Sequence, residues 1–132
     1  MSEGRKHILI VDDDKMVLFV LRRTLAGLAT GVKISTAKDG HEALQIIDSE
    51  PIDLVITDIK MPGIDGITLT ERLREKRDDI VVVWMTAFGC REYAAESDRL
   101  SVCSCLEKPL QINEIREAVE EAMVQKDSQA CH

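Results

Sequence analysis

The chain alternates short apolar runs with longer segments in which apolar residues recur at helical spacing. The short runs predict β-strands, and the longer segments predict amphipathic helices that connect them. This alternation occurs five times, which indicates five βα units. The predicted strands cover residues 8–11, 32–36, 54–57, 81–85 and 102–106.

The first, third and fourth runs are apolar throughout, which is typical of strands that are buried on both faces. The second run alternates polar and apolar residues, so we expect this strand at an edge of the sheet. Consecutive βα units predict an α/β fold, a doubly wound (βα)5 domain with right-handed crossovers. In such sheets, functional residues gather at the carboxyl ends of the strands.

Length and composition agree with one domain. The chain has 132 residues, of which 45% are hydrophobic, and this is enough for a core of its own. We expect a single domain over residues 1–132, with a core at about 7–124 and a polar tail at 125–132 that frays from Lys126. The net charge of -7 argues against direct nucleic-acid binding. Because no apolar run is long enough for a signal peptide or a membrane span, we expect a cytoplasmic protein without membrane contact.

The four cysteines are Cys90, Cys103, Cys105 and Cys131, and their spacing does not suggest a zinc site. Cys103 and Cys105 alternate within the fifth apolar run, so we expect them on the same side of a strand, where they cannot easily form a disulfide. The simplest interpretation is that the thiols are reduced and have packing roles.

Polar residues interrupt the apolar runs at their carboxyl ends. They are Asp12, Asp13 and Asp14 after the first run, Asp58 after the third, Thr86 after the fourth and Lys108 after the fifth. A single acid after a strand is often only a helix N-cap, and Asp14 suits that role for the first helix. The joint placement of acids, hydroxyl and ammonium at one edge instead predicts a common site.

The chemistry of such a site follows from its charges. Clustered carboxylates raise one another's pKa and destabilise the site unless a cation binds there. Oxygen ligands favour Mg²⁺, which is held by few protein carboxylates together with a phosphate. Asp58 could then act as the nucleophile toward a phosphoryl group, with Lys108 and Thr86 holding the phosphoryl oxygens. A cis bond before Pro109 would turn the chain and aim Lys108 inward.

Five motifs occur in order: ILIVDDD, the A-x-D-G-x-E-A-L pattern at residues 37–44, DLVITDIKMPGIDG, VVVWMTA and LEKPL. With these motifs the chain resembles the receiver domains of two-component response regulators, of the chemotaxis-regulator type, over roughly residues 8–123. The resemblance implies a flavodoxin-like fold with strand order 2-1-3-4-5. It also implies that a sensor histidine kinase, a phosphotransfer protein or a small phosphodonor phosphorylates Asp58.

The same resemblance implies the metal ligands. Asp13 would bind Mg²⁺ directly and Asp12 largely through water, while Asp58 and the backbone carbonyl of Lys60 would complete the protein ligands. For the phosphoryl group, it implies contacts from Thr86, from Lys108 and from the backbone N–H of Ala87. The Lys108–Pro109 bond would be cis.

Phosphorylation would change the surface of the fourth helix, fifth strand and fifth helix, and thereby control a downstream protein. The chain would be a phosphoacceptor that catalyses its own phosphotransfer and dephosphorylation rather than an ordinary enzyme. Three departures stand out: Cys105 occupies a position where the family usually has Tyr or Phe, Ser101 occupies a position where glycine is common, and Asp14 adds a third acid to the first loop. The sequence therefore does not indicate how phosphorylation changes the surface that a partner binds.

Two alternatives remain from the sequence. A pseudo-receiver would keep the fold but bind a partner without phosphate, which the missing aromatic at Cys105 favours and the intact acid set disfavours. A small Mg²⁺-dependent phosphatase of the haloacid dehalogenase class would also begin with a strand and the D-x-D pattern of residues 12–14. That class would leave the motif after Asp58 unexplained.

Overall fold

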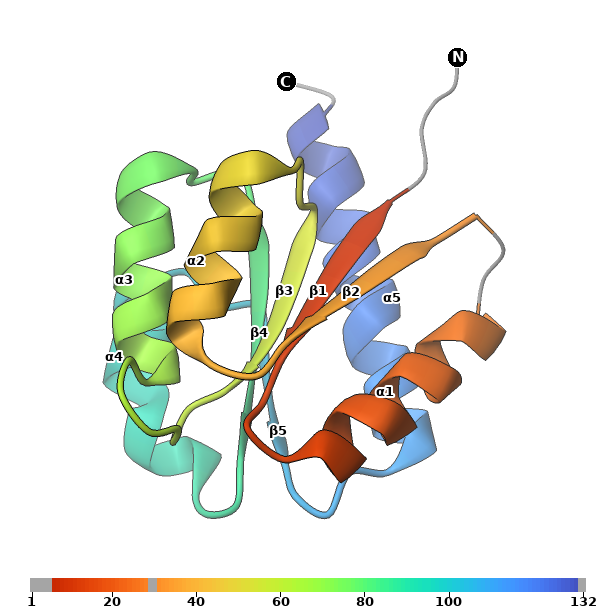
Figure 1. The fold of residues 1–132 in the computed structure, drawn as a ribbon, viewed down its shortest axis with the longest axis horizontal. Helices are drawn as coiled ribbons and strands as arrows, with labels where there is room; N and C mark the ends of the chain where they lie inside the picture. The colour runs from red at the N-terminus through yellow and green to blue at the C-terminus, as the bar shows by residue number, and fades with distance from the viewer. Residues whose placement is uncertain (1–5, 29–30, 131–132) are drawn as a thin grey trace.

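A five-stranded parallel sheet in the order β2-β1-β3-β4-β5 forms the centre of the computed structural model (Figure 1). The structure describes residues 6–28 and 31–130. The strands are β1 (His7–Val11), β2 (Lys33–Ala37), β3 (Leu54–Asp58), β4 (Val81–Thr86) and β5 (Ser104–Glu107). The helices are α1 (Lys15–Leu28), α2 (Gly40–Ser49), α3 (Gly66–Lys76), the short 3₁₀ helix η1 (Cys90–Tyr93), α4 (Ala94–Arg99) and α5 (Ile112–Ala130). This is the predicted flavodoxin-like α/β fold.

The buried and edge strands are those that the hydrophobic pattern predicts. All residues of β1, β3 and β4 are buried, as their continuous apolar runs require. The alternating strand β2 lies at an edge and is only partly buried. Strand β1 pairs in parallel with β3 so that Val11 lies beside Thr57, which brings the ends of these two strands together.

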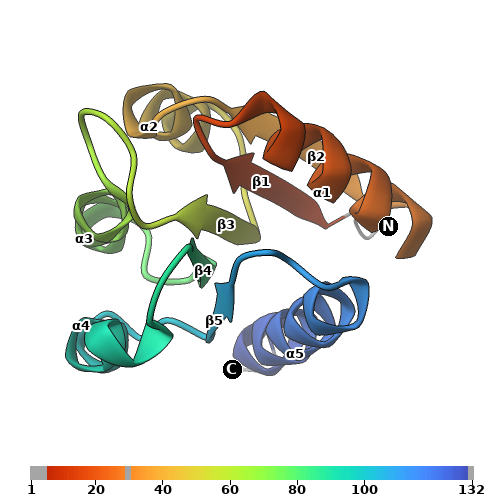
Figure 2. The ribbon, with the colours of Figure 1, turned by 90° about the horizontal axis from the view of Figure 1, so that it is seen from below.

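Helices cover both faces of the sheet. Figure 2, which views the molecule from below, shows α1 and α5 on one face and α2, α3 and α4 on the other. Each face has its own hydrophobic cluster, because successive strand residues point to opposite sides of the sheet. Leu9, Val55 and Trp84 belong to the cluster under α2 and α3, whereas Ile10 and Ile56 belong to the one under α1 and α5.

Aspartates cap three of the helices. The carboxylate of Asp14 accepts a hydrogen bond from the N–H of Met16 at the start of α1, as the sequence predicted. Asp39 accepts from Glu42 N–H in α2, and Asp65 from Thr68 N–H in α3. These caps satisfy N–H groups that have no partner within the helix. One acid of the predicted cluster, Asp14, therefore has a local structural role.

Two sequence-based boundaries are wrong. Strand β5 begins at Ser104 rather than at residue 102, because Ser101 has a left-handed backbone (φ 57°) and Val102 N–H bonds back to Ser97. Helix α5 continues to Ala130 instead of fraying from Lys126. Lys126 donates hydrogen bonds to the backbone carbonyl and carboxylate of Asp79, and these contacts hold this part of the helix against the sheet. Among the described helices, none is both long and apolar enough to cross a membrane.

Candidate functional site

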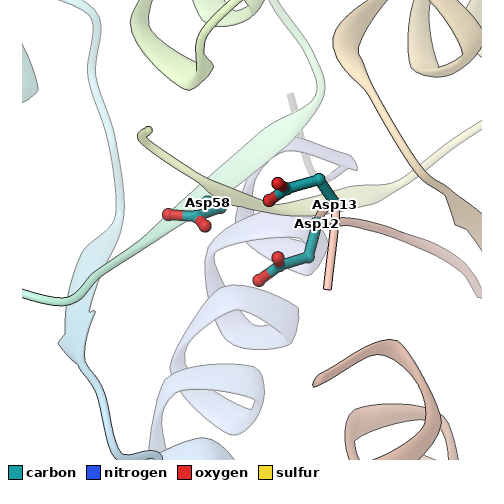
Figure 3. Close-up of side chains that lie close together, drawn as sticks. All are labelled: Asp12, Asp13 and Asp58. Atoms are coloured by element: carbon teal, nitrogen blue, oxygen red, sulfur yellow. The ribbon is translucent and has the colours of Figure 1, made fainter. Parts of the chain in front are cut away.

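Three carboxylates meet at the carboxyl end of the central strands. Asp12 and Asp13 follow β1, and Asp58 ends the neighbouring strand β3. Each side chain offers one oxygen, and these oxygens all lie within 4.8 Å of one another. Figure 3 shows the three side chains near one another, with the carboxylates of Asp12 and Asp13 extending toward the side on which Asp58 lies. The structure thus brings together the acids that the strand-end pattern singled out.

Burial differs within this group. Asp12 is fully buried and Asp58 is 6% exposed, whereas Asp13 is exposed to solvent. Burial raises the pKa of Asp12 above its ordinary value, although hydrogen bonds from Lys108 and from Asp14 N–H act in the opposite direction. A buried carboxylate among other carboxylates is unfavourable unless positive charge compensates it.

Lys108 supplies part of that positive charge. Its Nζ lies 2.9 Å from Oδ2 of Asp12 and 3.0 Å from Oδ2 of Asp58. Burial acts to lower the pKa of Lys108, but its hydrogen bonds to both carboxylates outweigh that effect and raise the pKa. The Lys108–Pro109 peptide bond is cis, as predicted. One ammonium therefore contacts two of the three acids, and the cluster keeps a net negative charge.

The chemistry of the donors fits a hard divalent cation. Three carboxylate oxygens within 4.8 Å, one of them on a fully buried side chain, form the oxygen-rich site that Mg²⁺ prefers. Lys60 lies beside them, because its backbone N–H donates to Oδ1 of Asp58 at 3.3 Å. Its side chain is exposed, and its carbonyl as a metal ligand stays a prediction.

Thr86 shares a cleft of about 420 Å³ with the phosphoacceptor candidate. Asp58, Lys60, Thr86, Ala87, Phe88, Glu92, Tyr93 and Lys108 line this cleft. The hydroxyl of Thr86 donates to the carbonyl of Phe88 at 3.0 Å, so it is engaged by its own loop. Thr86 and Ala87 thus lie at the same cleft as Asp58, and their contacts with a phosphoryl group stay a prediction. A ligand at Asp58 would receive the Thr86 hydroxyl only after its bond to Phe88 breaks.

Gly66 is a positioning residue that sequence reasoning did not assign. A Cβ at this position would collide with the backbone carbonyl oxygen of Asp58. The N–H of Gly66 also donates to the carbonyl of Ile59 at 2.7 Å, so α3 begins directly against the end of β3. The signal in the sequence was the glycine that ends the motif DLVITDIKMPGIDG. Only a residue without a side chain permits this close approach.

The cysteines differ from their predicted arrangement. Cys90 and Cys105 form a disulfide with a Cα–Cα distance of 5.9 Å, so the interpretation of both as simple packing thiols is wrong. Cys103 packs against the hydrophobic cluster under α1 and α5, whereas Cys105 packs against the opposite cluster. The expectation that they share a side fails because β5 begins only after Cys103. Cys131 lies outside the described residues.

Comparisons with known proteins agree with this geometry. The family model described as the response regulator receiver domain matches residues 8–120. Sporulation initiation phosphotransferase F of Bacillus subtilis is 36% identical over 123 residues, which are 93% of this chain and 98% of that protein. The DNA-binding transcriptional regulator NtrC of Escherichia coli is 33% identical over 119 residues, which are 90% of this chain but only 25% of that protein.

One solved structure is also similar to this chain over most of its length. The response regulator protein TrrA from Thermotoga maritima, in complex with Mg(2+)-BeF, is 32% identical, with a TM-score of 0.77 and coverage of 89% of this chain and 98% of that chain. The phosphatase alternative is not favoured, because the receiver-domain match spans most of the sequence. The chain therefore belongs to the response regulator receiver domain family, whose members are phosphoacceptor signalling domains.

Proposed function

We propose that Asp58 accepts a phosphoryl group and that the chain works as a phosphorylation-dependent switch. The observation that carries this proposal is the contact of Lys108 with both Asp58 and buried Asp12, at 3.0 and 2.9 Å, beside a third carboxylate. Such a cluster costs stability, and binding a cation and a phosphoryl group would offset that cost.

The proposed metal is Mg²⁺, held by Asp12, Asp13, Asp58 and the backbone carbonyl of Lys60. When bound, the ion would neutralise charge on the phosphoryl oxygens during transfer. The chemistry of the donors supports this choice, as does the presence of Mg(2+)-BeF in the structure of the Thermotoga relative.

Side chains and one backbone N–H of the chain would each have a role in phosphoryl transfer. A carboxylate oxygen of Asp58 attacks phosphorus and forms the new P–O bond, while the bond from phosphorus to the donor's leaving group breaks. The ammonium of Lys108, already 3.0 Å from Asp58, would hold a phosphoryl oxygen. The Thr86 hydroxyl would leave the Phe88 carbonyl to hold another oxygen, together with the N–H of Ala87.

The donor would be a sensor histidine kinase or a phosphotransfer protein. Next to the acid cluster, α1 exposes the large apolar side chains of Met16, Phe19 and Val20. Their spacing places them on one face of the helix, where they form an exposed hydrophobic patch of the kind that marks protein interaction sites. We propose that the donor docks on this patch and thereby reaches Asp58.

The output surface would consist of α4, β5 and α5. A pocket of about 530 Å³ lies between β5 and α5, and Glu107, Glu114, Glu117 and Glu121 are part of its lining. Four acids favour a protein partner that presents Lys or Arg. Because the net charge is -7, we do not expect the partner to be nucleic acid. We also propose that residues 1–132 act as a single receiver domain in the cytoplasm.

Phosphorylation by acetyl phosphate in Mg²⁺ tests the proposal. The natural chain should gain one acyl phosphate, seen as a mass increase by intact-protein mass spectrometry, and Asp58→Asn should gain none. Asp48→Asn is the matched control, since Asp48 is an exposed aspartate of α2 that pairs with Lys76. Equal labelling of Asp58→Asn and the natural chain would refute the assignment, and absence of labelling in both would favour a pseudo-receiver.

A further inference from the structure

The Cys90–Cys105 disulfide joins two elements that frame the proposed phosphorylation site. Cys90 begins η1, the short helix after β4, and Cys105 lies in β5, where it is beside Trp84 of β4. Fifteen positions separate the two cysteines in the sequence, so the bond closes a loop that contains η1 and α4.

The bond holds one end of the short segment that follows Thr86. At one end of this segment, the carbonyl of Thr86 accepts a hydrogen bond from Lys108 N–H at 2.8 Å. At the other end, Cys90 is bonded to Cys105, and its N–H donates to Oε2 of Glu107 at 3.0 Å. Residues 87–89 are therefore held to β5 at one end and to Lys108, the residue directly after β5, at the other.

In this arrangement the Thr86 hydroxyl is not directed to Asp58. It donates to the carbonyl of Phe88, which lies inside the fixed segment. Moving that hydroxyl toward a phosphoryl group requires the carbonyl of Phe88 to release it. Because Cys90 is covalently bonded to Cys105, we expect residues 87–89 to move less. The disulfide should therefore favour the arrangement in which the Thr86 hydroxyl donates to the Phe88 carbonyl.

Small thiols can reach the bond. Cys90 and Cys105 are both only half-buried, and both line the open pocket of about 530 Å³ between β5 and α5. Exposure of this kind permits thiol–disulfide exchange, which requires attack of a thiolate on a disulfide sulfur. In a reducing compartment, disulfides are usually transient and regulatory rather than permanent.

We propose that Cys90 and Cys105 form a reversible redox switch that weakens phosphorylation-dependent activation when the disulfide is present. The oxidant is a small disulfide such as glutathione disulfide. The two cysteine thiols lose two electrons and two protons, one S–S bond forms between them, and the S–S bond of the oxidant breaks to give two thiols. Two small thiols, or one dithiol, reverse the reaction.

The effect on activation rests on the proposed function of Asp58, whereas formation of the disulfide does not. The reduced protein should bind beryllofluoride with Mg²⁺ about fivefold or more tightly than the oxidised protein, within the usual range of coupling between two sites. Because coupling is reciprocal, beryllofluoride with Mg²⁺ should make the disulfide easier to reduce by the same factor.

The first experiment measures the bond alone. The full chain carrying Cys103→Ser and Cys131→Ser is equilibrated with defined ratios of glutathione and glutathione disulfide, and free thiols are then alkylated and mapped by mass spectrometry. The expected result is an intramolecular Cys90–Cys105 link that forms and disappears reversibly with the ratio. Free thiols at both positions even in excess glutathione disulfide would overturn the proposal.

Cys103 provides an internal control in the natural chain. Burial, followed by the charge of Glu121, raises the pKa of the Cys103 thiol, so this thiol should react slowly and stay outside the exchange. Cys103→Ser should leave the Cys90–Cys105 equilibrium unchanged, and Cys90→Ser should abolish it. A dominant link between Cys103 and Cys105 would also overturn the proposal.

The second experiment compares beryllofluoride binding and acetyl phosphate labelling of the oxidised and reduced forms. The expected result is tighter binding and faster labelling of the reduced form, with Cys90→Ser behaving as reduced under both conditions. Equal binding by both forms would overturn the redox coupling while Asp58 remains the phosphoacceptor. Absence of labelling in both forms would instead refute the proposed function and, with it, the coupling.

Discussion

Aspartates gather at both ends of the parallel sheet, but their charges are balanced differently. At the carboxyl end, Asp12, Asp13 and Asp58 lie together and Lys108 contacts two of them. At the amino end, Asp53 and Asp79 precede β3 and β4 and are contacted by well-placed donors. Lys126 lies 3.7 Å from Asp53 and 3.4 Å from Asp79, Arg77 pairs with Asp79, and His7 N–H donates to Asp53.

The acids at the amino end contribute to stability, whereas those at the carboxyl end form the candidate functional site. Hydrogen bonds and opposite charges at the amino end anchor α5 to the sheet, and these groups need no ligand. At the carboxyl end, Asp12, Asp13 and Asp58 together carry more negative charge than Lys108 neutralises. One of these carboxylates, that of Asp12, is fully buried. Proteins often tolerate such a cost at sites that bind a ligand. The two ends should therefore respond in opposite ways when an acid is removed.

Replacing Lys108 by Ala should give the largest loss of stability. The change leaves buried Asp12 without its ammonium partner, and we expect the free energy of unfolding to fall by about 2 to 3 kcal/mol. This is less than for a fully buried pair, because the Lys108 side chain is 22% exposed. Urea denaturation at neutral pH in the absence of metal measures the change.

Lys76→Ala is the control for this variant. Lys76 pairs with Asp48 on the surface, where both side chains are about half exposed, so the loss should be no more than about 0.5 kcal/mol. Equal effects of the two variants would mean that Lys108 contributes no more than a surface ion pair.

Replacing Asp13 by Asn should have the opposite sign. The exposed Asp13 adds repulsion to the cluster, so its neutralisation should raise the free energy of unfolding by about 0.5 to 1 kcal/mol without metal. The stabilisation that Mg²⁺ gives to the natural chain should shrink in the same variant, because a proposed ligand is lost. Denaturation with and without Mg²⁺ measures both effects.

Asp48→Asn is the corresponding control for Asp13→Asn. It removes an acid that has a lysine partner, so a small loss of stability and an unchanged response to Mg²⁺ are expected. If Asp13→Asn were destabilising in the absence of metal, the cluster would not carry the proposed repulsion.

The smallest expected effect is at the amino end and depends on pH. Burial acts to raise the pKa of Asp79, but the hydrogen bond from Arg77 and the charge of Lys126 outweigh it and lower the pKa below its ordinary value. A lowered pKa contributes stability that is fully present above the unfolded value and is lost as pH falls through the folded value. Asp79→Asn should thus cost a few tenths of a kcal/mol at pH 7 and nothing in strong acid.

Denaturation of Asp79→Asn and the natural chain from neutral to strongly acidic pH measures this difference. A gap between the two proteins that persists or grows in acid would contradict the assignment. The same series with Asp98→Asn, an exposed position in α4, shows how much of the change any surface acid would give.

Much of the fold could be predicted because its causes are local. Runs that are apolar throughout correctly indicated β1, β3 and β4, and alternation correctly indicated an edge position for β2. Since parallel strands place their carboxyl ends at one edge, Asp12, Asp58, Thr86 and Lys108 could be grouped from sequence alone.

Features that depend on contacts between distant residues could not be predicted. The Cys90–Cys105 bond needs the chain to turn at Gly89, whose φ is 66°, and to return through α4 to β5. The extension of α5 depends on contacts of Lys126 with Asp79, 47 positions away. Neither arrangement has a signature within a short stretch of sequence, because each is set by packing of elements that are remote along the chain.

Chemical trapping of the phosphorylated residue shows whether Asp58 is the phosphoacceptor. The chain is phosphorylated with acetyl phosphate in Mg²⁺ and treated with borohydride, which reduces an aspartyl phosphate to homoserine, and its peptides are then sequenced by mass spectrometry. We predict homoserine at position 58 and unmodified aspartate at positions 12 and 13. Homoserine at either of those positions, with aspartate retained at position 58, would contradict the assignment of Asp58 as the phosphoacceptor.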